Sequence, residues 1–198
     1  MAEDTISDAA SDQLSVEEEK FLLQLARAAL EVGIGGDPLP QLELTSLPPK
    51  LIKPGATFIT LTKNQELRGC IGSLEATRPL AEDVRVHAVA AALEDFRFPP
   101  VQEDEIPQIS IEISRLTTPA KIVFEDPDEL FSHIRPGIDG VVIKKGIRRA
   151  TFLPQVWGKV PEVEIFLEML CRKMGASAEC WRSKSVEIFT YQVEKFCE

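Results

Sequence analysis

The sequence contains no long hydrophobic run, and this absence argues against a membrane protein. None of its apolar stretches approaches the roughly 20 residues that a helix needs to cross a bilayer. The first twelve residues, MAEDTISDAASD, are acidic and have neither the basic start nor the apolar stretch of a secretory signal. We therefore expect a soluble, cytoplasmic protein with no membrane contact.

Recognisable metal-ligand and phosphate-binding patterns are absent as well. The two histidines, His87 and His133, show no ligand spacing, and no C-x-x-C pair or glycine-rich phosphate loop occurs. The four cysteines are Cys70, Cys171, Cys180 and Cys197. In a cytoplasmic protein they are expected to be free thiols. The sequence therefore predicts no metal site and no cofactor.

Basic residues are too few to favour a nucleic-acid partner. The chain has 22 lysines and arginines against 32 aspartates and glutamates, a net charge of −10. Phosphate binding depends mainly on lysine and arginine, so we expect no nucleic acid as a partner. One segment departs from this balance, because residues 144–149 read KKGIRR. Its charges either form a basic patch or protect a sheet edge, and the second interpretation is favoured.

What the sequence does contain is the composition of an ordinary globular domain. Hydrophobic residues make up 44% and charged residues 27% of the chain. A chain of 198 residues buries roughly 70% of its extended surface, so it needs no disulfide or metal to fold. We expect residues 1–13 to form a disordered acidic tail and residues 14–198 to form a single domain, with room for two lobes.

Helical and strand-like segments are interleaved along the domain. A capping box formed by Ser15 and Glu18 begins a helix that continues to about Val32. Further helices are predicted over residues 77–95 and 161–174, and strands over residues 57–62, 66–71, 109–116, 140–144, 148–153 and 186–196. Because short turns join two pairs of these strands, the pairing is antiparallel. The predicted class is α+β, an antiparallel sheet flanked by helices.

The hexapeptide LRGCIG at residues 67–72 has an unusual composition for a strand. Glycine weakens a strand unless another group must approach the backbone closely or the strand must bend. Strict alternation along the strand places Arg68 and Cys70 on one face and Leu67 on the other. An arginine and a thiol side by side, flanked by glycines, indicate a functional site.

Cys70 is the candidate catalytic residue. A guanidinium near a thiol lowers its pKa and favours the nucleophilic thiolate, and Arg68 is on the appropriate face. The N–H groups of Gly69 or Gly72 would then face a developing oxyanion. However, nothing in the sequence places a histidine base beside this thiol. The alternative, which is favoured, is that Cys70 packs as a small hydrophobic residue.

Arg68 has two interpretations of equal weight. It binds an anionic ligand through both arms of its guanidinium, or it pairs with a carboxylate such as Glu66 or Glu75. His87 lies on an apolar stripe of the second predicted helix and is interpreted as a hydrogen-bonded residue of the core or of a cleft.

Weaker candidates for ligand binding lie outside the hexapeptide. Arg97 in FRFPP and Arg149 before ATFLPQ extend the idea of an anion site, although each is individually a better candidate for an ion pair. Gln155 in FLPQVW has the chemistry to line a pocket, as has Trp157, for which a core position is favoured.

Several motifs together resemble a known family. LRGCIG, RPLAEDV, FRFPP, RPGIDGV, RRATFLPQVW and YQVEKF occur in this order. This pattern resembles the AMMECR domain family, whose prokaryotic members are labelled AmmeMemoRadiSam system protein A, over roughly residues 14–196. One position departs from the family pattern, which usually has proline or another small residue where this chain has Phe96.

The resemblance implies a two-lobed α+β domain with the hexapeptide at a cleft between the lobes. It also implies two protein partners, a Memo-like protein and a radical SAM protein. No reaction comes with the family, so whether the chain is an enzyme stays open. Two hypotheses follow: the protein handles a small molecule, an anion being one option, around Arg68 and Cys70, or it is a non-catalytic binding or adaptor module for the two partners.

Overall fold

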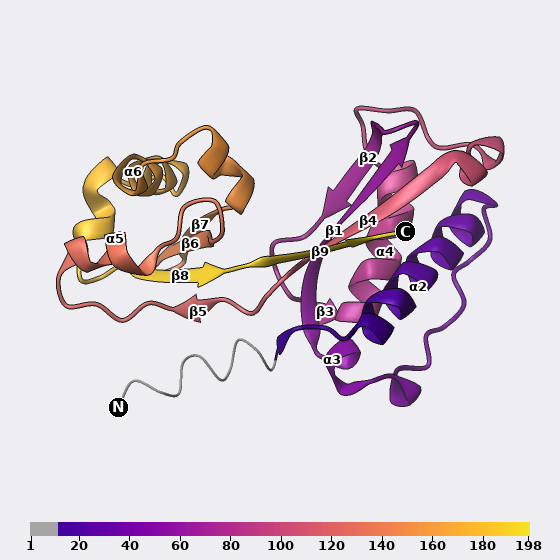
Figure 1. Ribbon diagram of the computed structural model, residues 1–198, viewed down its shortest axis with the longest axis horizontal. Coiled ribbons are helices and arrows are strands. Elements are labelled where there is room, and N and C mark those ends of the chain that lie inside the picture. Colours follow the sequence, from indigo (N-terminus) through magenta and orange to yellow (C-terminus); the bar gives the residue numbers. More distant parts are fainter. Residues whose placement is uncertain (1–11) are drawn as a thin grey trace. The chain divides into compact units, whose positions relative to one another are not determined.

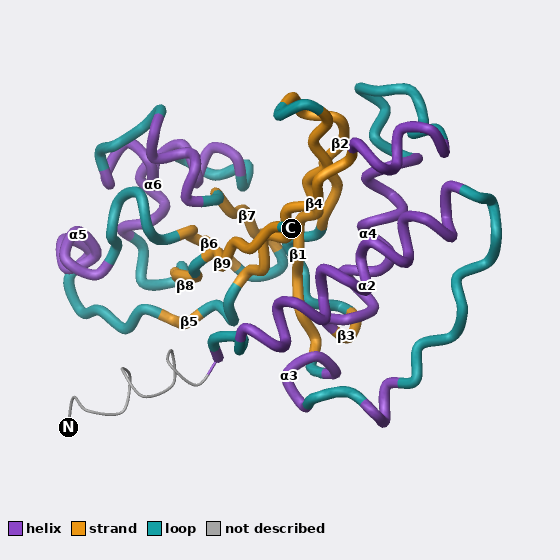
Figure 2. The backbone as a smooth tube through the Cα atoms, turned by 45° about the vertical axis from the view of Figure 1, so that its right-hand side comes forward, coloured by secondary structure: helices purple, strands orange, loops and turns teal. Residues whose placement is uncertain are grey.

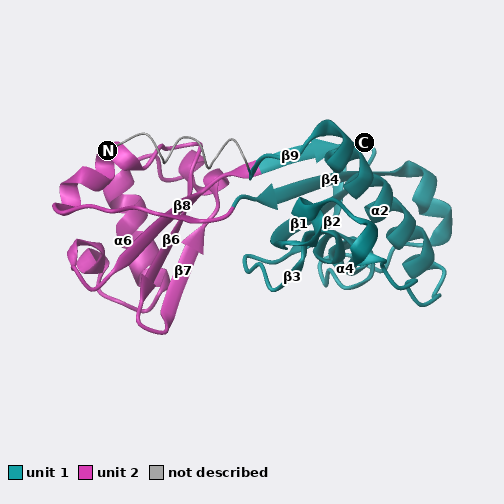
Figure 3. Cartoon of the chain, turned by 90° about the horizontal axis from the view of Figure 1, so that it is seen from below, with its two compact units in different colours: residues 1–117, 194–198 teal, residues 118–193 magenta. Residues whose placement is uncertain are grey.

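The computed structural model describes residues 12–198, so the predicted tail over residues 1–13 lies almost entirely outside the described residues (Figure 1). The chain divides into two compact units, residues 12–117 with 194–198 (unit 1) and residues 118–193 (unit 2), which Figure 3 colours separately. Each unit has its own sheet and its own hydrophobic core. No helix within residues 12–198 is long and apolar enough to span a membrane.

Unit 1 is built on a five-stranded sheet in the order β2-β1-β4-β9, with β3 paired to the start of β1. Its strands are β1 (Pro54–Lys63), β2 (Glu66–Gly72), β3 (Arg78–Pro79), β4 (Ile109–Leu116) and β9 (Val193–Cys197). Its helices are α2 (Val16–Ile34), α3 (Pro49–Ile52) and α4 (Leu80–Leu93), with short 3-10 helices at Leu44–Ser46 and Glu103–Gln108. β1 runs antiparallel to β2 and to β4, and the predicted hairpin of β1 and β2 is confirmed.

Local signals explain where α2 begins. The capping box is present as predicted, because the side chain of Ser15 accepts the N–H of Glu18 (3.2 Å) and the Glu18 carboxylate accepts the N–H of Ser15 (2.8 Å). The helix continues through Gly33 to Ile34, beyond its predicted end. Gly33 has a packing role inside it, because a Cβ atom there would lie 2.8 Å from the side chain of Val89 in α4.

The two long helices of unit 1 contribute to one core on one face of the sheet. α4 packs against α2 on one side and against β1 and β2 on the other, an arrangement visible in Figure 2. This position explains why α4 has apolar residues on both sides. The core includes Leu22, Leu30, Ile59, Leu61, Val84, Ile111 and Ile113. Side chains that alternate with the core residues of the strands, such as Thr60 and Glu112, lie on the opposite face of the sheet.

Unit 2 has a four-stranded antiparallel sheet in the order β5-β8-β6-β7. Its elements are β5 (Ala120–Lys121), α5 (Leu130–His133), β6 (Gly140–Lys145), β7 (Arg148–Phe152), α6 (Val163–Lys173) and β8 (Glu187–Tyr191), with 3-10 helices at Pro127–Glu129, Pro154–Gly158 and Ala178–Arg182. The predicted hairpin of β6 and β7 is confirmed, with a positive φ of 60° at Gly146 in its turn. The whole chain is α+β, as predicted.

The prediction of a single final strand over residues 186–196 was wrong in one respect. Residues 186–196 do not form one strand, because the chain passes from β8 to β9 at Gln192. β8 pairs with β6 in the sheet of unit 2, whereas β9 lies beside β4 in the sheet of unit 1. Neither glycine nor proline marks this change of sheet in the sequence.

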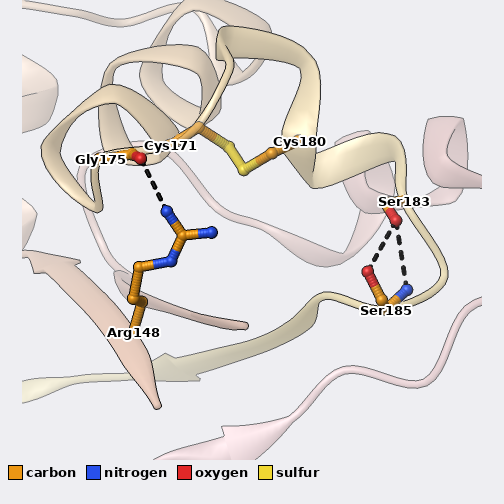
Figure 4. Close-up of a disulfide and its surroundings, with 6 residues drawn as sticks. All are labelled: Arg148, Cys171, Gly175, Cys180, Ser183 and Ser185. Atoms are coloured by element: carbon orange, nitrogen blue, oxygen red, sulfur yellow. Dashed lines mark hydrogen bonds between the residues drawn. A yellow bond between two sulfur atoms is a disulfide. The ribbon is translucent and has the colours of Figure 1, made fainter. Parts of the chain in front are cut away.

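The prediction of four free thiols was also wrong. Cys171 in α6 and Cys180 in the following 3-10 helix form a disulfide, with their Cα atoms 6.1 Å apart (Figure 4). Gly175, at a φ of 76°, lies in the turn that brings the chain back toward α6. The carbonyl oxygen of Gly175 accepts a hydrogen bond from Arg148 (2.8 Å), which ties this turn to β7. Cys70 and Cys197 are free thiols.

Candidate functional site

The hexapeptide forms most of β2, at the edge of the sheet, and contains a bulge. Gly69 lies opposite Leu61 of β1 and Leu67 lies opposite Thr62, so Arg68 is an extra residue without a cross-strand partner. The bulge interrupts the alternation of side chains. The prediction that Leu67 and Cys70 lie on opposite faces of the sheet was therefore wrong. The register of β1 and β2 places both residues on the same face.

The thiol of Cys70 lies on the face of the sheet opposite the helices, in a row of polar side chains. Cys70 lies opposite Thr60 of β1, and its half-buried sulfur is 3.3 Å from the Thr60 hydroxyl oxygen. Thr60 in turn lies opposite Glu112 of β4, whose carboxylate binds Lys195 of β9 (3.1 Å). We call Cys70, Thr60, Glu112 and Lys195 the polar row.

His87 lies on the other side of the sheet from this thiol. The residue next to Cys70, Gly69, faces α4, because a Cβ atom there would lie 2.1 Å from the carbonyl oxygen of Ala91. His87 precedes Ala91 by one turn of α4, and its Nδ1 lies 3.1 Å from a carboxylate oxygen of Asp83. Since successive strand residues point to opposite faces, the imidazole of His87 and the thiol do not form a catalytic pair.

Arg68 is bound within the protein through three of its nitrogen atoms. Its Nε and Nη2 donate to the two carboxylate oxygens of Glu105 (3.1 and 2.9 Å), and its Nη1 donates to the carbonyl of Pro99 (2.9 Å). The side chain is 12% exposed. The hydrogen bond from Arg68 lowers the pKa of Glu105 to about 2, with help from the N–H of Gln102 and the ammonium of Lys63. The acidic partner is thus neither of the two carboxylates considered from the sequence.

Asp95 and Arg97 cover the open edge of β2 at Cys70. The N–H of Cys70 donates to Asp95 Oδ2 (2.8 Å), and its carbonyl accepts from Arg97 Nη2 (3.4 Å). Arg97 also binds both carboxylate oxygens of the buried Asp95 (2.9 and 2.6 Å). This guanidinium holds the pKa of Asp95 well below its usual value, against the opposing effect of burial. The two side chains take the place of a neighbouring strand.

The glycines of the hexapeptide are required by the protein's own packing. Gly69 meets the backbone of α4, as described above. A Cβ atom at Gly72 would lie 2.2 Å from the carbonyl oxygen of Thr57 and 2.5 Å from the ring of Phe58. Both glycines therefore permit close approach of neighbouring segments of unit 1, and neither needs an external ligand to explain it.

The other residues that the sequence suggested for ligand binding belong to unit 2, whereas the hexapeptide belongs to unit 1. Arg149 in β7 and Gln155 in the 3-10 helix of residues 154–158 are exposed. Trp157 is buried, stacks on Phe166 with ring centroids 3.6 Å apart, and donates its Nε1 hydrogen to the carbonyl of Asp139 (2.7 Å). The favoured core position of Trp157 is thus confirmed.

One buried polar cluster was not predicted from the sequence. The carboxylate of Asp83 accepts the N–H (2.9 Å) and the hydroxyl (2.7 Å) of Thr57 and lies beside His87, which links α4 to β1. Its other oxygen lies 3.7 Å from Nε of Arg78. The only sequence signal at Asp83 is its place in the first turn of a helix, where an acid suits the helix dipole. Among residues 12–198, no three His, Cys, Asp or Glu side chains are grouped closely enough to hold a metal ion.

Comparison with known proteins gives one consistent result. A family model described as AMMECR1 matches residues 23–196. A protein of Methanothermobacter thermautotrophicus is 36% identical over 188 residues, which is 93% of this chain and 96% of that protein. A protein of Methanocaldococcus jannaschii is 35% identical over 192 residues, 93% and 92% of the two chains. The crystal structure of an uncharacterized protein from Pyrococcus horikoshii is similar with a TM-score of 0.71 and 33% identity, covering 93% of each chain.

Proposed function

The chain belongs to the AMMECR1 family, and from this premise we propose that it works as a binding module for other proteins and not as an enzyme. The proposal rests on one observation, that the guanidinium of Arg68 is already bound by other groups of the protein. The guanidinium that made the hexapeptide a candidate ligand site is bound to Glu105 and Pro99 inside the protein. An incoming anion would have to displace a carboxylate that already holds both arms of this guanidinium.

The surroundings of Cys70 support the same function. A nucleophilic thiol needs a nearby cation or base, and the histidine of unit 1 is on the other side of the sheet. The guanidinium of Arg97 donates a hydrogen bond to the carbonyl of Cys70, but two of its nitrogens are bound to the carboxylate of Asp95. The polar groups of the hexapeptide thus support a rigid edge of the sheet, which suits a binding surface.

The resemblance supplies the partners to test, a Memo-like protein and a radical SAM protein. The experiment immobilises the purified chain and measures the binding of each protein by biolayer interferometry at low salt. We expect saturable binding of at least one of them with a Kd in the micromolar range, which is typical of transient complexes. Absence of binding by both proteins would contradict the proposed function.

A second candidate function is the handling of a small molecule at the polar row. One observation favours it: the sulfur of Cys70 is half-buried, free and 3.3 Å from a hydroxyl, on a face with a glutamate and a lysine. The cleft that the resemblance implies at this position stays a prediction, as do ligand-binding roles for Arg149 and Gln155.

Alkylation with iodoacetamide, a neutral reagent, tests this second candidate. If Cys70 is an activated thiol, it reacts faster than the exposed Cys197 in the folded protein, although it is less exposed. If the protein is only a binding module, Cys197 reacts faster than Cys70. Mass spectrometry of the two cysteine peptides over time gives both rates, and the disulfide between Cys171 and Cys180 keeps the other sulfurs out of the reaction.

A further inference from the structure

The segment that follows α4, residues 94–104, runs along the hexapeptide and has an unusual surface. Its exposed residues include three acids, three apolar residues and one arginine that is paired with Asp95: Glu94, Glu103, Asp104, Phe96, Pro99, Pro100 and Arg97. Phe96 is 94% exposed. We call residues 94–104 the post-helix segment.

This segment is irregular but firmly held. Asp95 accepts the N–H of Cys70 (2.8 Å), and the carbonyl of Pro99 accepts a hydrogen bond from Arg68 (2.9 Å). The N–H of Val101 donates to a carbonyl of α4 (2.9 Å). The hexapeptide therefore binds the segment at two points, the side chain of Asp95 and the backbone carbonyl of Pro99. A loop fixed on a rigid sheet in this way is a common arrangement for binding residues.

Phe96 lies in a turn whose ends are joined. The N–H of Phe98 donates to the carbonyl of Asp95 (3.0 Å), and the side chain of Asp95 also accepts the N–H of Arg97 (3.2 Å). Burial of a phenylalanine side chain normally stabilises a fold, and this fold does not obtain that stabilisation from Phe96. An aromatic ring on an already ordered turn loses little backbone entropy when a partner covers it. Phenylalanine is one of the aromatic residues that are enriched in the buried core of protein interfaces.

The charge around Phe96 defines the chemistry of the partner. Residues 12–117 with 194–198 carry 19 acidic and 11 basic residues, whereas residues 118–193 are nearly balanced, with 10 acidic and 11 basic residues. The acids of the post-helix segment at residues 94, 103 and 104 are exposed. A surface with this charge attracts basic proteins and repels acidic ones and nucleic acids.

We infer that the post-helix segment is the docking surface for a separate protein with an apolar pocket in basic surroundings, and that Phe96 enters this pocket. The inference rests on the proposed function and names the surface that performs it. The hexapeptide then has an indirect role, because Cys70 binds the side chain of Asp95 and Arg68 binds the carbonyl of Pro99, on either side of Phe96 in the sequence.

The test compares four forms of the full-length chain in the interferometry assay with the Memo-like and the radical SAM protein. They are wild type, Phe96→Ala, Ile147→Ala, and the double variant Glu103→Lys with Asp104→Lys. Ile147 is the matched control, because it is an apolar side chain as exposed as Phe96 but lies in unit 2. We expect Phe96→Ala to raise Kd at least tenfold and Ile147→Ala to change Kd less than twofold. The double variant should also raise Kd, and its binding should depend less on the salt concentration.

The outcomes separate the inference from the proposed function. Binding by wild type with an unchanged Kd for Phe96→Ala would overturn the inference and leave the binding function in place. Absence of binding by wild type would overturn both. If Phe96→Ala instead abolished self-association seen by analytical ultracentrifugation, the occupant would be a second copy of this chain and the inference of a separate partner would be wrong. Because Phe96 is exposed, its replacement should leave the thermal unfolding temperature unchanged, which excludes misfolding as the cause.

Discussion

Replacing Gly69 with alanine tests whether the hexapeptide is built around contacts inside unit 1. The added methyl group would lie 2.1 Å from the carbonyl oxygen of Ala91 and 3.1 Å from its carbonyl carbon. These are backbone atoms, so no side-chain rotation relieves the clash, and α4 or β2 must move. Overpacking of this kind costs about 1–3 kcal/mol, and we expect about 3 kcal/mol because the obstacle is backbone. For a chain of this size, that lowers the unfolding temperature by about 6–12 °C.

The measurement is urea unfolding followed by circular dichroism, with Gly158→Ala as the matched control. A methyl group added at Gly158 would have no atom within 4 Å, and the residue has no positive φ, so alanine there should be neutral or stabilise the protein by up to about 1 kcal/mol. A Gly69→Ala variant with the stability of wild type would refute the close approach of β2 and α4. The explanation of the hexapeptide as a structural edge would then lose its main support.

Two further predictions concern stability. Glu105→Gln should lower the free energy of unfolding at pH 7 by about 2 kcal/mol. The shift of the Glu105 pKa from 4.5 to about 2 corresponds to about 3 kcal/mol, reduced here because water reaches part of the side chain. Since folding lowers this pKa, the loss of stability in Glu105→Gln should be complete above pH 4.5 and disappear as the pH falls toward 2. A loss of stability that does not depend on pH would contradict the role of Arg68. Reducing the disulfide between Cys171 and Cys180, nine residues apart, should lower stability by about 2–3 kcal/mol in urea titrations, and four reactive thiols in the unreduced, unfolded protein would show that no disulfide exists.

Elements with local signals could be predicted from the sequence. The capping box at Ser15 uses two side chains three residues apart, and the turn at Gly146 needs a residue that accepts positive φ. Alternation of apolar residues identified β4, and the two hairpins followed from short turns between strands. These features depend on neighbours in the sequence, and the fold class follows from them.

Features that depend on residues distant in the sequence were missed. The bulge at Arg68 adds one residue to a strand and leaves no mark in the hydrophobic pattern. The disulfide joins cysteines on either side of a turn, with no short motif around them. The site itself depends on Asp95, whose carboxylate binds the backbone of Cys70, 25 residues away. Contacts between a side chain and a distant backbone have no sequence pattern, so the sequence did not reveal this one.

If the protein acts by binding partners, the thiol of Cys70 takes no chemical part in its function. The most direct test is the Kd of the Memo-like and the radical SAM protein for wild type and for Cys70→Ser, measured side by side. Serine keeps the approximate size of the side chain and removes its nucleophilic sulfur, while the backbone bonds to Asp95 and Arg97 remain. We expect the same Kd, within twofold, for both forms. Loss of binding in Cys70→Ser with an unchanged unfolding temperature, or no binding by wild type, would contradict it.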